Sequence, residues 1–562
     1  MSSSPRPPGR HTCVVVGGGL AGMLTAAALA RAGAGEVVVV ERDALPDGPF
    51  PRKGLPQAHH AHLLWSGGAT AVDSLLPGTI GALREDGAHR ISLPTNMVGL
   101  SPEGWFRRWA RESHYVLVAS RDLLDWHVRR AVAALPNVTV ADRTEVLGLT
   151  GGARRVTGVR VRGADAVAGV LDADLVVDAS GRASRTPLWL EGFGVPRPAV
   201  RTVDPGLVYA SRIFRAPKDL GNTFPVVVNV QAGDPRRAGP GRSATLVPIE
   251  GDRWLVTLSG TRGGEPGRDP AAFGEFARGL RHPIVSELIA GAEPLTDVVL
   301  TRTTVNRRHH YEKAALPAGL LVLGDAVAAY NPVYGHGMSV AAQSALALRD
   351  AVARYGLADP RLAARAQKAL AGPVAAAWAL STGNDVFYPG ATESGPTAAE
   401  RAVAAYVRRL MRTSTGNGRV ARAVTDVMTL ERPASRLFTP PVLLAALLGP
   451  RRAGAITSNV WVTASAAKAG AKGAGSPVTA SASQRWTACS MVCMRIQKPV
   501  VRSPWGDQVH TGTSGPSSRR TATRSRAAAA DQSNSSSGTG PRCGVRSGSG
   551  QAARTAGSAG RA

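Results

Sequence analysis

The chain has 562 residues, of which 44% are hydrophobic, and this suits a globular protein of two or three domains. No run approaches the ~20 apolar residues of a membrane span, and the first ten residues lack the apolar segment of a secretory signal. We therefore expect a cytoplasmic protein without a membrane span. The formal net charge of +27 would suit nucleic acid, but 12 of the 67 Lys and Arg residues lie in positions 476–562, and the earlier basic runs do not alternate with aromatic residues, which argues against nucleic-acid binding.

The early part of the chain alternates valine-rich runs with stretches of helical periodicity. Near-continuous valine runs are typical of parallel strands that are covered on both faces. The lone early cysteine, Cys13, falls in the first of these runs, where a thiol is usually a small core residue. The expected strands are 13–16, 36–41, 155–161 and 174–179, and the expected helices are 20–32 and 121–134.

Residues 205–300 show a different pattern. Short segments such as LVYASRIF and RWLVTLSG alternate apolar and polar residues between polar turns, which predicts antiparallel strands. From residue 339 to about 448 the pattern is mostly helical. The sequence thus predicts an α/β fold in which a parallel-sheet domain is interrupted by a mixed β domain and is followed by helices.

From about residue 455 the hydrophobic periodicity fades and Ser, Thr, Ala, Gly and Arg dominate. Such a segment buries too little apolar surface to offset its ordering entropy. We expect residues 456–562 to be a low-complexity, disordered tail. A second hypothesis is read-through or out-of-frame translation of a GC-rich gene, which the coding DNA would test. Cys489 and Cys493 in this tail have no second cysteine pair nearby, which argues against zinc.

A glycine motif lies between the first expected strand and helix. Residues 13–22 read CVVVGGGLAG, so Gly17, Gly19 and Gly22 form G-x-G-x-x-G. This spacing permits a tight turn, close approach of the backbone to a pyrophosphate, and close packing of helix on strand. The second valine-rich strand ends at Glu41, 19 residues after Gly22, where an acid would bind an adenosine ribose. The combination predicts a dinucleotide site, and the alternative is a tight turn without a ligand.

A second motif follows a later apolar strand. Residues 321–339 read LVLGDAVAAYNPVYGHGMS, in which Asp325 is followed by Pro332, Gly335 and Gly337. The carboxylate would accept from a ribityl hydroxyl, and the glycines would let the backbone reach an isoalloxazine ring. A helix from about Met338 would direct its N–H groups at the reduced ring. This motif favours FAD over NAD, and the alternative is an N-cap aspartate in a loop.

With these motifs the chain resembles the class A flavin monooxygenases, which have the para-hydroxybenzoate hydroxylase fold. Within that group it is most similar to the flavin epoxidases of polyether ionophore biosynthesis, of the monensin and lasalocid type. The similarity runs over roughly residues 11–450. It is carried by GGGLAGML (17–24), RKGLPQAHHAHLLWSGG (52–68), SRDLLDW (120–126), DLVVDASGR (174–182), SGTRGGEP (259–266), TVNRRHHY (304–311) and GDAVAAYNPVYGHGMS (324–339).

The resemblance implies a set of FAD-binding residues. Glu41 would bind the adenosine ribose, Arg52 the pyrophosphate, and Arg121 would lie along the cofactor. The family's DG motif stands here as Asp178-Ala-Ser-Gly181, which leaves its nicotinamide-related role open. The full set is Gly17, Gly19, Leu20, Ala21, Gly22, Glu41, Arg42, Arg52, Arg121, Asp325, Pro332, Gly335, Gly337 and Met338.

The resemblance also implies a division into domains. A Rossmann-like FAD-binding domain would be discontinuous and interleaved with a mixed β-sheet substrate domain, and a C-terminal helical region would follow. The FAD-binding domain would comprise 11–75, 115–192 and 298–372, the substrate domain 76–114 and 193–297, and the helical region 373–455.

The implied activity is epoxidation of the alkenes of a linear polyene polyketide in polyether antibiotic biosynthesis. NAD(P)H would reduce FAD, O2 would form a flavin C4a-hydroperoxide, and no side chain or metal would be catalytic. The substrate would be a lipophilic small molecule, either free or bound to a carrier protein. The alternative is a flavin-dependent hydroxylase of an aromatic or other polyketide. A halogenase is disfavoured because its W-x-W-x-I-P motif is missing, and a non-enzymatic basic binding protein is the remaining alternative.

Three further groups of residues invite a functional interpretation. His59, His60 and His62 have no carboxylate at ligand spacing, which argues against a metal site. Because the same string occurs in the resembling family, the resemblance implies an active-site wall. The basic run 307–310 (RRHH) would attract an NADPH phosphate or an acidic substrate, or else be a solvated strand end. The tryptophans of 105–109 (WFRRW) would line a lipophilic pocket or simply pack.

Overall fold

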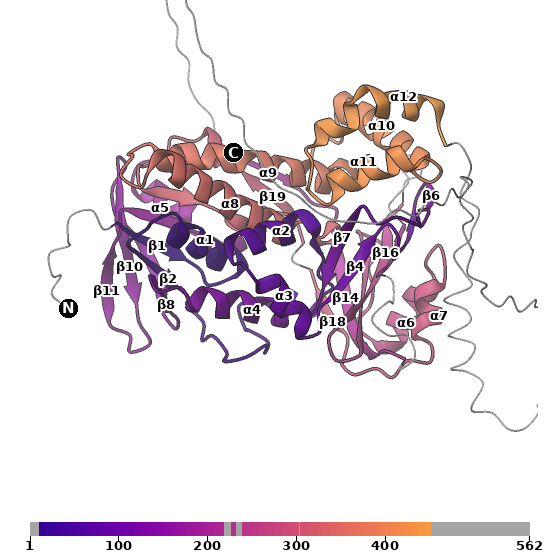
Figure 1. Ribbon diagram of the computed structural model, residues 1–562, viewed down its shortest axis with the longest axis horizontal. Helices are drawn as coiled ribbons and strands as arrows, with labels where there is room; N and C mark the ends of the chain where they lie inside the picture. The colour runs from indigo at the N-terminus through magenta and orange to yellow at the C-terminus, as the bar shows by residue number, and fades with distance from the viewer. Residues whose placement is uncertain (1–10, 218–225, 232–238, 303, 451–562) are drawn as a thin grey trace, which may run out of the picture. The chain divides into compact units, whose positions relative to one another are not determined.

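The computed structural model describes residues 11–217, 226–231, 239–302 and 304–450, and these residues are the basis of all that follows (Figure 1). The predicted disordered tail, 456–562, and the cysteines within it lie outside the described residues.

A five-stranded parallel sheet carries the N-terminal part of the chain. Its central strand pairs with a neighbour on each side, so that Val14 lies between Val38 and Val176. The predicted α/β fold with a parallel, Rossmann-like sheet is confirmed. The strand order is β20 (Leu320–Val322), β12 (Leu175–Asp178), β1 (Thr12–Val16), β2 (Glu36–Val40) and β8 (Val138–Ala141).

Each face of this sheet is covered by a different layer. Because side chains alternate along a strand, Cys13 and Val15 point to one face and Val14 and Val16 to the other. Helices pack on the first face and a three-stranded antiparallel sheet on the second (Figure 1). The helices are α1 (Leu20–Arg31), α2 (Ser66–Leu75), α3 (Thr79–Glu85), α4 (Arg121–Ala133) and α8 (Gly337–Tyr355); the strands are β9 (Glu145–Gly151), β10 (Val156–Arg162) and β11 (Ala168–Asp172).

A seven-stranded, mostly antiparallel sheet forms the second layered region, as the alternating pattern of residues 205–300 predicts. One face packs on α6 (Pro270–Arg278) and α7 (Ile284–Ile289), two helices that the sequence analysis missed. The other face packs on a small sheet of β3 (Leu64–Trp65), β7 (His114–Val118) and β4 (His89–Leu93). The seven strands, in order, are β18 (Val299–Thr301), β14 (Val208–Arg215), β17 (Arg253–Gly260), β16 (Arg242–Ile249), β15 (Val226–Gln231), β5 (Met97–Ser101) and β6 (Gly104–Trp105).

The remaining elements join these layers and end the described chain. A three-stranded sheet links the regions, and helices dominate after residue 337, as predicted. Among the described residues, none of the helices has the length and hydropathy that crossing a membrane requires. These elements are α5 (Thr186–Gly192), β13 (Val200–Val203), β19 (Asn306–His309), β21 (Ala328–Ala329), α9 (Leu362–Asp385), α10 (Ala398–Ser414), α11 (Gly418–Met428) and α12 (Pro440–Leu448).

Candidate cofactor site

The glycine turn joins β1 to α1 at the carboxyl edge of the parallel sheet. Gly17 has φ of 102°, and a Cβ there would lie 2.8 Å from the carbonyl oxygen of Ala179. A Cβ on Gly22 would lie only 1.8 Å from the carbonyl oxygen of Gly17, so the helix packs directly on the turn. A Cβ on Gly19, in contrast, would meet no atom within 4 Å. The first and third glycines therefore build the turn, and the second faces open space where a pyrophosphate could approach.

Glu41 and Arg52 lie beside this turn. The Oε2 atom of Glu41 accepts hydrogen bonds from the Gly18 backbone N–H at 2.8 Å and from Nη2 of Arg52 at 3.1 Å. Arg52 is 7% exposed and donates from Nη1 to the Gly18 carbonyl and to Asp125, while its buried Nε has no partner. Arg42, by contrast, has a side chain that is 65% exposed and pairs only with neighbouring Asp43. The structure thus gathers two of the three predicted polar residues of this loop.

The sequence analysis missed Asp125. This carboxylate is 2% exposed and lies one helical turn after Arg121 and one before Arg129. It accepts from Arg52 at 3.1 Å and from Nε of Arg129 at 3.0 Å, and so it ties the loop of Arg52 to helix α4. The spacing of four residues within RDLLDWHVR is a signal that could have found it, because residues four apart share a helix face.

Asp325 and Arg121 form the second half of the site. Asp325 is half-buried in a 3-10 turn, Gly324–Ala326, after β20, and its carboxylate makes no hydrogen bond among the described residues. Burial raises the pKa of this carboxyl, while the nearby charges of Arg182, Arg121 and Arg307 oppose that rise. Arg121 is 6% exposed, its Nε is buried without a partner, and burial lowers its pKa. The carboxylate of Asp325 can therefore still accept a hydrogen bond, and Nε of the nearby Arg121 can still donate one.

The two motifs converge although about 300 residues separate them. A Cβ on Gly324 would lie 2.7 Å from Cβ of Ala21 in the first turn of α1, so the Asp325 turn packs on the glycine-turn helix. The neighbouring Leu20 is buried in the core. Both motifs follow the carboxyl ends of parallel strands, where ligands of such sheets bind.

The glycine-rich segment after Asp325 continues the site. Pro332 begins a 3-10 turn, Pro332–Tyr334, which ends at Gly335 with φ of 65°. A Cβ on Gly335 would lie 3.2 Å from Leu63, whereas one on Gly337 would meet nothing within 4 Å. Helix α8 starts at Gly337, and Met338 is buried in the core. This segment therefore presents bare backbone at the start of a helix.

The Asp178 motif has a structural role. Asp178 is fully buried, and its carboxylate accepts hydrogen bonds from the backbone and hydroxyl of Ser180 and from the hydroxyls of Ser184 and Thr186. Its hydrogen-bonding capacity is therefore filled from within the loop. Arg182 of the same motif donates to two backbone carbonyls, of residues 305 and 330, and so holds the segment after Asp325.

Of the histidines at residues 59–62, His60 lies against the seven-stranded sheet. Nδ1 of His60 lies 2.7 Å from the hydroxyl of Ser211, which lies 2.7 Å from that of Thr257. The ring of His60 also packs on Tyr209, with centroids 5.3 Å apart. Burial lowers the pKa of His60 to about 4 and that of His62 to about 3, so both are neutral at pH 7.

The basic run and the tryptophans separate in the structure. Arg308 and His310 both pair with Glu312, at 2.9 and 3.0 Å. Arg307 donates a hydrogen bond to the backbone carbonyl of Arg182. These three side chains of the basic run therefore already have partners within the protein. Trp105 stacks edge-on against His282. Trp109 instead lines a small apolar pocket, together with Trp65, Met97, Phe106, Val424 and Met428.

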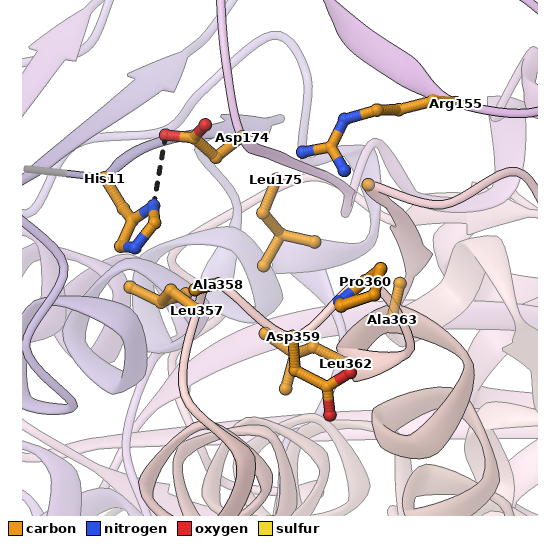
Figure 2. Close-up of a pocket in the computed structure, with 11 residues that line it drawn as sticks. His11, Arg155, Asp174, Leu175, Leu357, Ala358, Asp359, Pro360, Leu362 and Ala363 are labelled. Carbon is orange, nitrogen blue, oxygen red and sulfur yellow. Dashed lines mark ion pairs between the residues drawn. The ribbon is translucent and has the colours of Figure 1, made fainter. Parts of the chain in front are cut away.

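Another pocket lies at the opposite edge of the parallel sheet (Figure 2). Its volume is about 180 Å³, and its lining includes His11, Arg155 and Asp174. His11 pairs with Asp174 at 3.5 Å, which is the contact drawn in Figure 2. These residues precede the strands, so this pocket is separate from the carboxyl edge that carries the two glycine motifs.

The residues at the carboxyl edge fit FAD. An open glycine, an unbonded carboxylate and a buried guanidinium with an unpartnered Nε are the groups that a dinucleotide would satisfy. Residues 12–186 match the family described as FAD dependent oxidoreductase. Among solved structures, the flavin-dependent brominase Bmp2 has a TM-score of 0.56 at 15% identity, covering 78% of this chain and 98% of its own, which shows a shared fold.

The chain therefore belongs to the FAD-dependent oxidoreductase family. Its relatives include Protein Rv3254 of Mycobacterium tuberculosis, which is 32% identical over 395 residues, or 67% of this chain and 81% of that protein. The 6-methylpretetramide 4-monooxygenase of Streptomyces rimosus is 28% identical over 362 residues, or 62% of this chain and 77% of that enzyme.

Proposed function

We propose that the chain is an FAD-dependent monooxygenase that epoxidises alkenes of a linear polyene polyketide, using NAD(P)H and O2. The observation that carries the proposal is the convergence of the glycine turn and the Asp325 turn at one edge of the parallel sheet. That arrangement suits a long cofactor with an anionic middle and a hydroxylated chain. A cytoplasmic location, where NADPH is available, is part of the proposal.

Each part of FAD would have its own residues. The turn at Gly19 and the start of α1 would hold the pyrophosphate, with Arg52 beside it, and Glu41 would bind the ribose after releasing the Gly18 N–H. Asp325 and Arg121 would bind the ribityl chain. Residues 11–75, 115–192 and 298–372 would then make up the FAD-binding domain. Bound FAD would supply the oxygen-transfer chemistry.

The segment from Pro332 to Met338 would face the flavin ring. Its bare glycines let backbone N–H groups approach a ligand, and α8 directs its N-terminal end there. The protein's own task would be to hold the alkene near the ring and to exclude water. His60, which is neutral, 4% exposed and hydrogen-bonded to Ser211, would add no charge to the substrate side.

The choice of substrate class rests on sequence similarity and on the apolar lining nearby. Trp65 lines the apolar pocket and donates from Nε1 to the carbonyl of Tyr334, so that pocket adjoins the segment proposed to face the ring. The second candidate, hydroxylation of an aromatic polyketide, is favoured by the similarity to 6-methylpretetramide 4-monooxygenase.

The experiment is incubation of FAD-loaded protein with NADPH, labelled O2 and two substrates, a linear trisubstituted polyene and a polycyclic phenol. Mass spectrometry should find one labelled oxygen atom for each epoxide formed in the polyene. A hydroxylated phenol with an unchanged polyene would support the second candidate. NADPH consumption that yields only hydrogen peroxide with both substrates would contradict the proposal.

A further inference from the structure

Asp385, the last residue of α9, lies at the centre of a buried hydrogen-bond cluster. It is 1% exposed. Its Oδ2 accepts from Nδ2 of Asn306 at 2.8 Å and from Nδ2 of Asn331 at 2.8 Å, and its Oδ1 accepts from the hydroxyl of Tyr334 at 2.9 Å. Three donors from two separate segments therefore converge on one carboxylate.

Two of these donors bracket the 3-10 turn that precedes Gly335. Asn331 caps the turn, since its Oδ1 accepts from the N–H of Val333 at 3.0 Å. Its own N–H donates to Oδ1 of Asn306 at 2.6 Å. Tyr334 is the last residue of the turn. Asp385 thus holds the first and the last side chain of the segment that leads into the bare glycines.

The chemistry of the cluster requires a carboxylate. All three partners donate, and only an ionised carboxyl accepts from all of them without presenting a donor of its own. Among the described residues no Arg or Lys forms an ion pair with Asp385, and burial raises its pKa to about 6 despite the three hydrogen bonds. Burial therefore makes the ionised carboxylate costly to stability, and the three hydrogen bonds offset part of that cost.

We propose that Asp385 is a positioning residue that fixes the conformation of the segment from Asn331 to Gly337 and thereby the binding of the flavin ring. Its effect on the segment is independent of any cofactor, and its effect on the ring rests on the function proposed above. Among the described residues, its hydrogen bonds to the segment are those with Asn331 and Tyr334, so its role is distinct from that of residues expected to touch FAD.

The first test uses Asp385→Asn with Thr382→Val as a matched control. Thr382 is also buried in α9 and bonds only within its helix, to the carbonyl of Trp378. In the ligand-free protein, hydrogen–deuterium exchange of a peptide covering residues 331–340 should accelerate about tenfold in D385N, because one donor loses its acceptor. Peptides from β1 and α1 should be unchanged, and T382V should leave the 331–340 peptide unchanged.

The second test measures FAD by the quenching of its fluorescence and by the visible spectrum of the bound form. We expect D385N to raise the Kd about tenfold and to alter the spectrum. Tyr334→Phe removes the hydrogen bond to Oδ1 of Asp385 from its other end, and so should also accelerate exchange of the 331–340 peptide in the ligand-free protein. Faster exchange confined to the 331–340 peptide in both D385N and Y334F is the outcome that a loss of general stability would not produce.

The outcomes separate the two proposals. Unchanged exchange at 331–340 in D385N overturns the positioning role, as does acceleration spread evenly over all peptides. Faster exchange with an unchanged Kd and spectrum overturns the link to the ring. Failure of the wild-type protein to take up FAD would contradict the proposed function, and the exchange experiment would still decide the role of Asp385 in the segment.

Discussion

Arg52 donates a hydrogen bond from Nη1 to Oδ2 of Asp125 at 3.1 Å, and Nη2 pairs with Glu41 at the same distance. One guanidinium therefore holds together the loop after β2, the acid at the end of β2 and helix α4. The pairing places a buried cation beside the glycine turn, where the phosphates of FAD are proposed to lie.

Arg52→Ala should leave Glu41 and Asp125 without their shared partner. We expect the free energy of unfolding to fall by about 3 kcal/mol, as when one partner of a buried ion pair is removed, and FAD to bind more weakly. Arg42→Ala, at an exposed position, is the control and should change stability by less than about 0.5 kcal/mol. Chemical denaturation and FAD titration measure both effects, and equal behaviour of the two variants would contradict this account.

The glycines of the turn should separate stability from cofactor binding. Gly22→Ala places a Cβ 1.8 Å from a backbone oxygen, so we expect a loss of about 3 kcal/mol or more, or a failure to fold. Gly19→Ala meets no neighbour and should cost no more than about 1 kcal/mol. Its FAD affinity should nonetheless fall about tenfold, because the new methyl group keeps the pyrophosphate from the backbone. Unimpaired FAD binding by G19A would place the cofactor elsewhere.

Asp325→Asn should have opposite effects on stability and on binding. Burial raises the pKa of Asp325, so its ionised form costs stability above its unfolded-state pKa, and removing the charge should leave the ligand-free Tm unchanged or higher. FAD affinity should fall because the ribityl hydroxyl would meet a neutral amide oxygen in place of the stronger carboxylate acceptor. Calorimetry of the ligand-free protein measures the change in Tm, and FAD titration measures the change in affinity. A large drop in the ligand-free Tm would assign Asp325 a structural role.

His336 should make the protein sensitive to acid. Its Nε2 donates to the carbonyl of Met428 at 3.0 Å, its buried Nδ1 has no partner, and burial lowers its pKa to about 4. Since the folded-state pKa lies below the unfolded value of about 6.5, its contribution is intact above that pH and is lost as the pH falls towards 4. The full effect is about 3 kcal/mol.

The matching measurement is denaturation of wild type and His336→Gln between pH 7 and pH 4. The free energy of unfolding should fall less steeply in H336Q than in wild type over this window. Parallel curves for wild type and H336Q would rule out His336 as a source of the acid sensitivity.

Local sequence patterns predicted the elements that carry the site. The glycine turn, the strand ending near Glu41 and the helix starting near Met338 depend on backbone conformation and periodicity within a few residues, which a sequence displays directly. Helices α6 and α7 were missed because the surrounding strand pattern masked them. The Asp269 cap and Pro270 at the start of α6 were nevertheless a visible signal.

The polar residues that support the site were harder to predict. Asp385 bonds to residues 54 and 79 positions away, and no local spacing points to such partners. Arg42 was predicted as one of the residues that the resemblance implies, yet its side chain is 65% exposed and pairs with Asp43. The resemblance placed Asp178 in a cofactor motif without assigning its role. The structure shows that its carboxylate accepts hydrogen bonds from Ser180, Ser184 and Thr186.

The close approach of Ala21 and Gly324 bears on the order in which the chain can assemble. Strand β1 and helix α1 are synthesised some 300 residues before β20 and α8, which complete the same sheet and cover it. Until then the nascent chain holds an unpaired sheet edge and an uncovered apolar face, a condition that favours slow folding and self-association. Refolding from denaturant should accordingly show a late, rate-limiting phase that reports closure of this sheet, and its yield should fall as protein concentration rises.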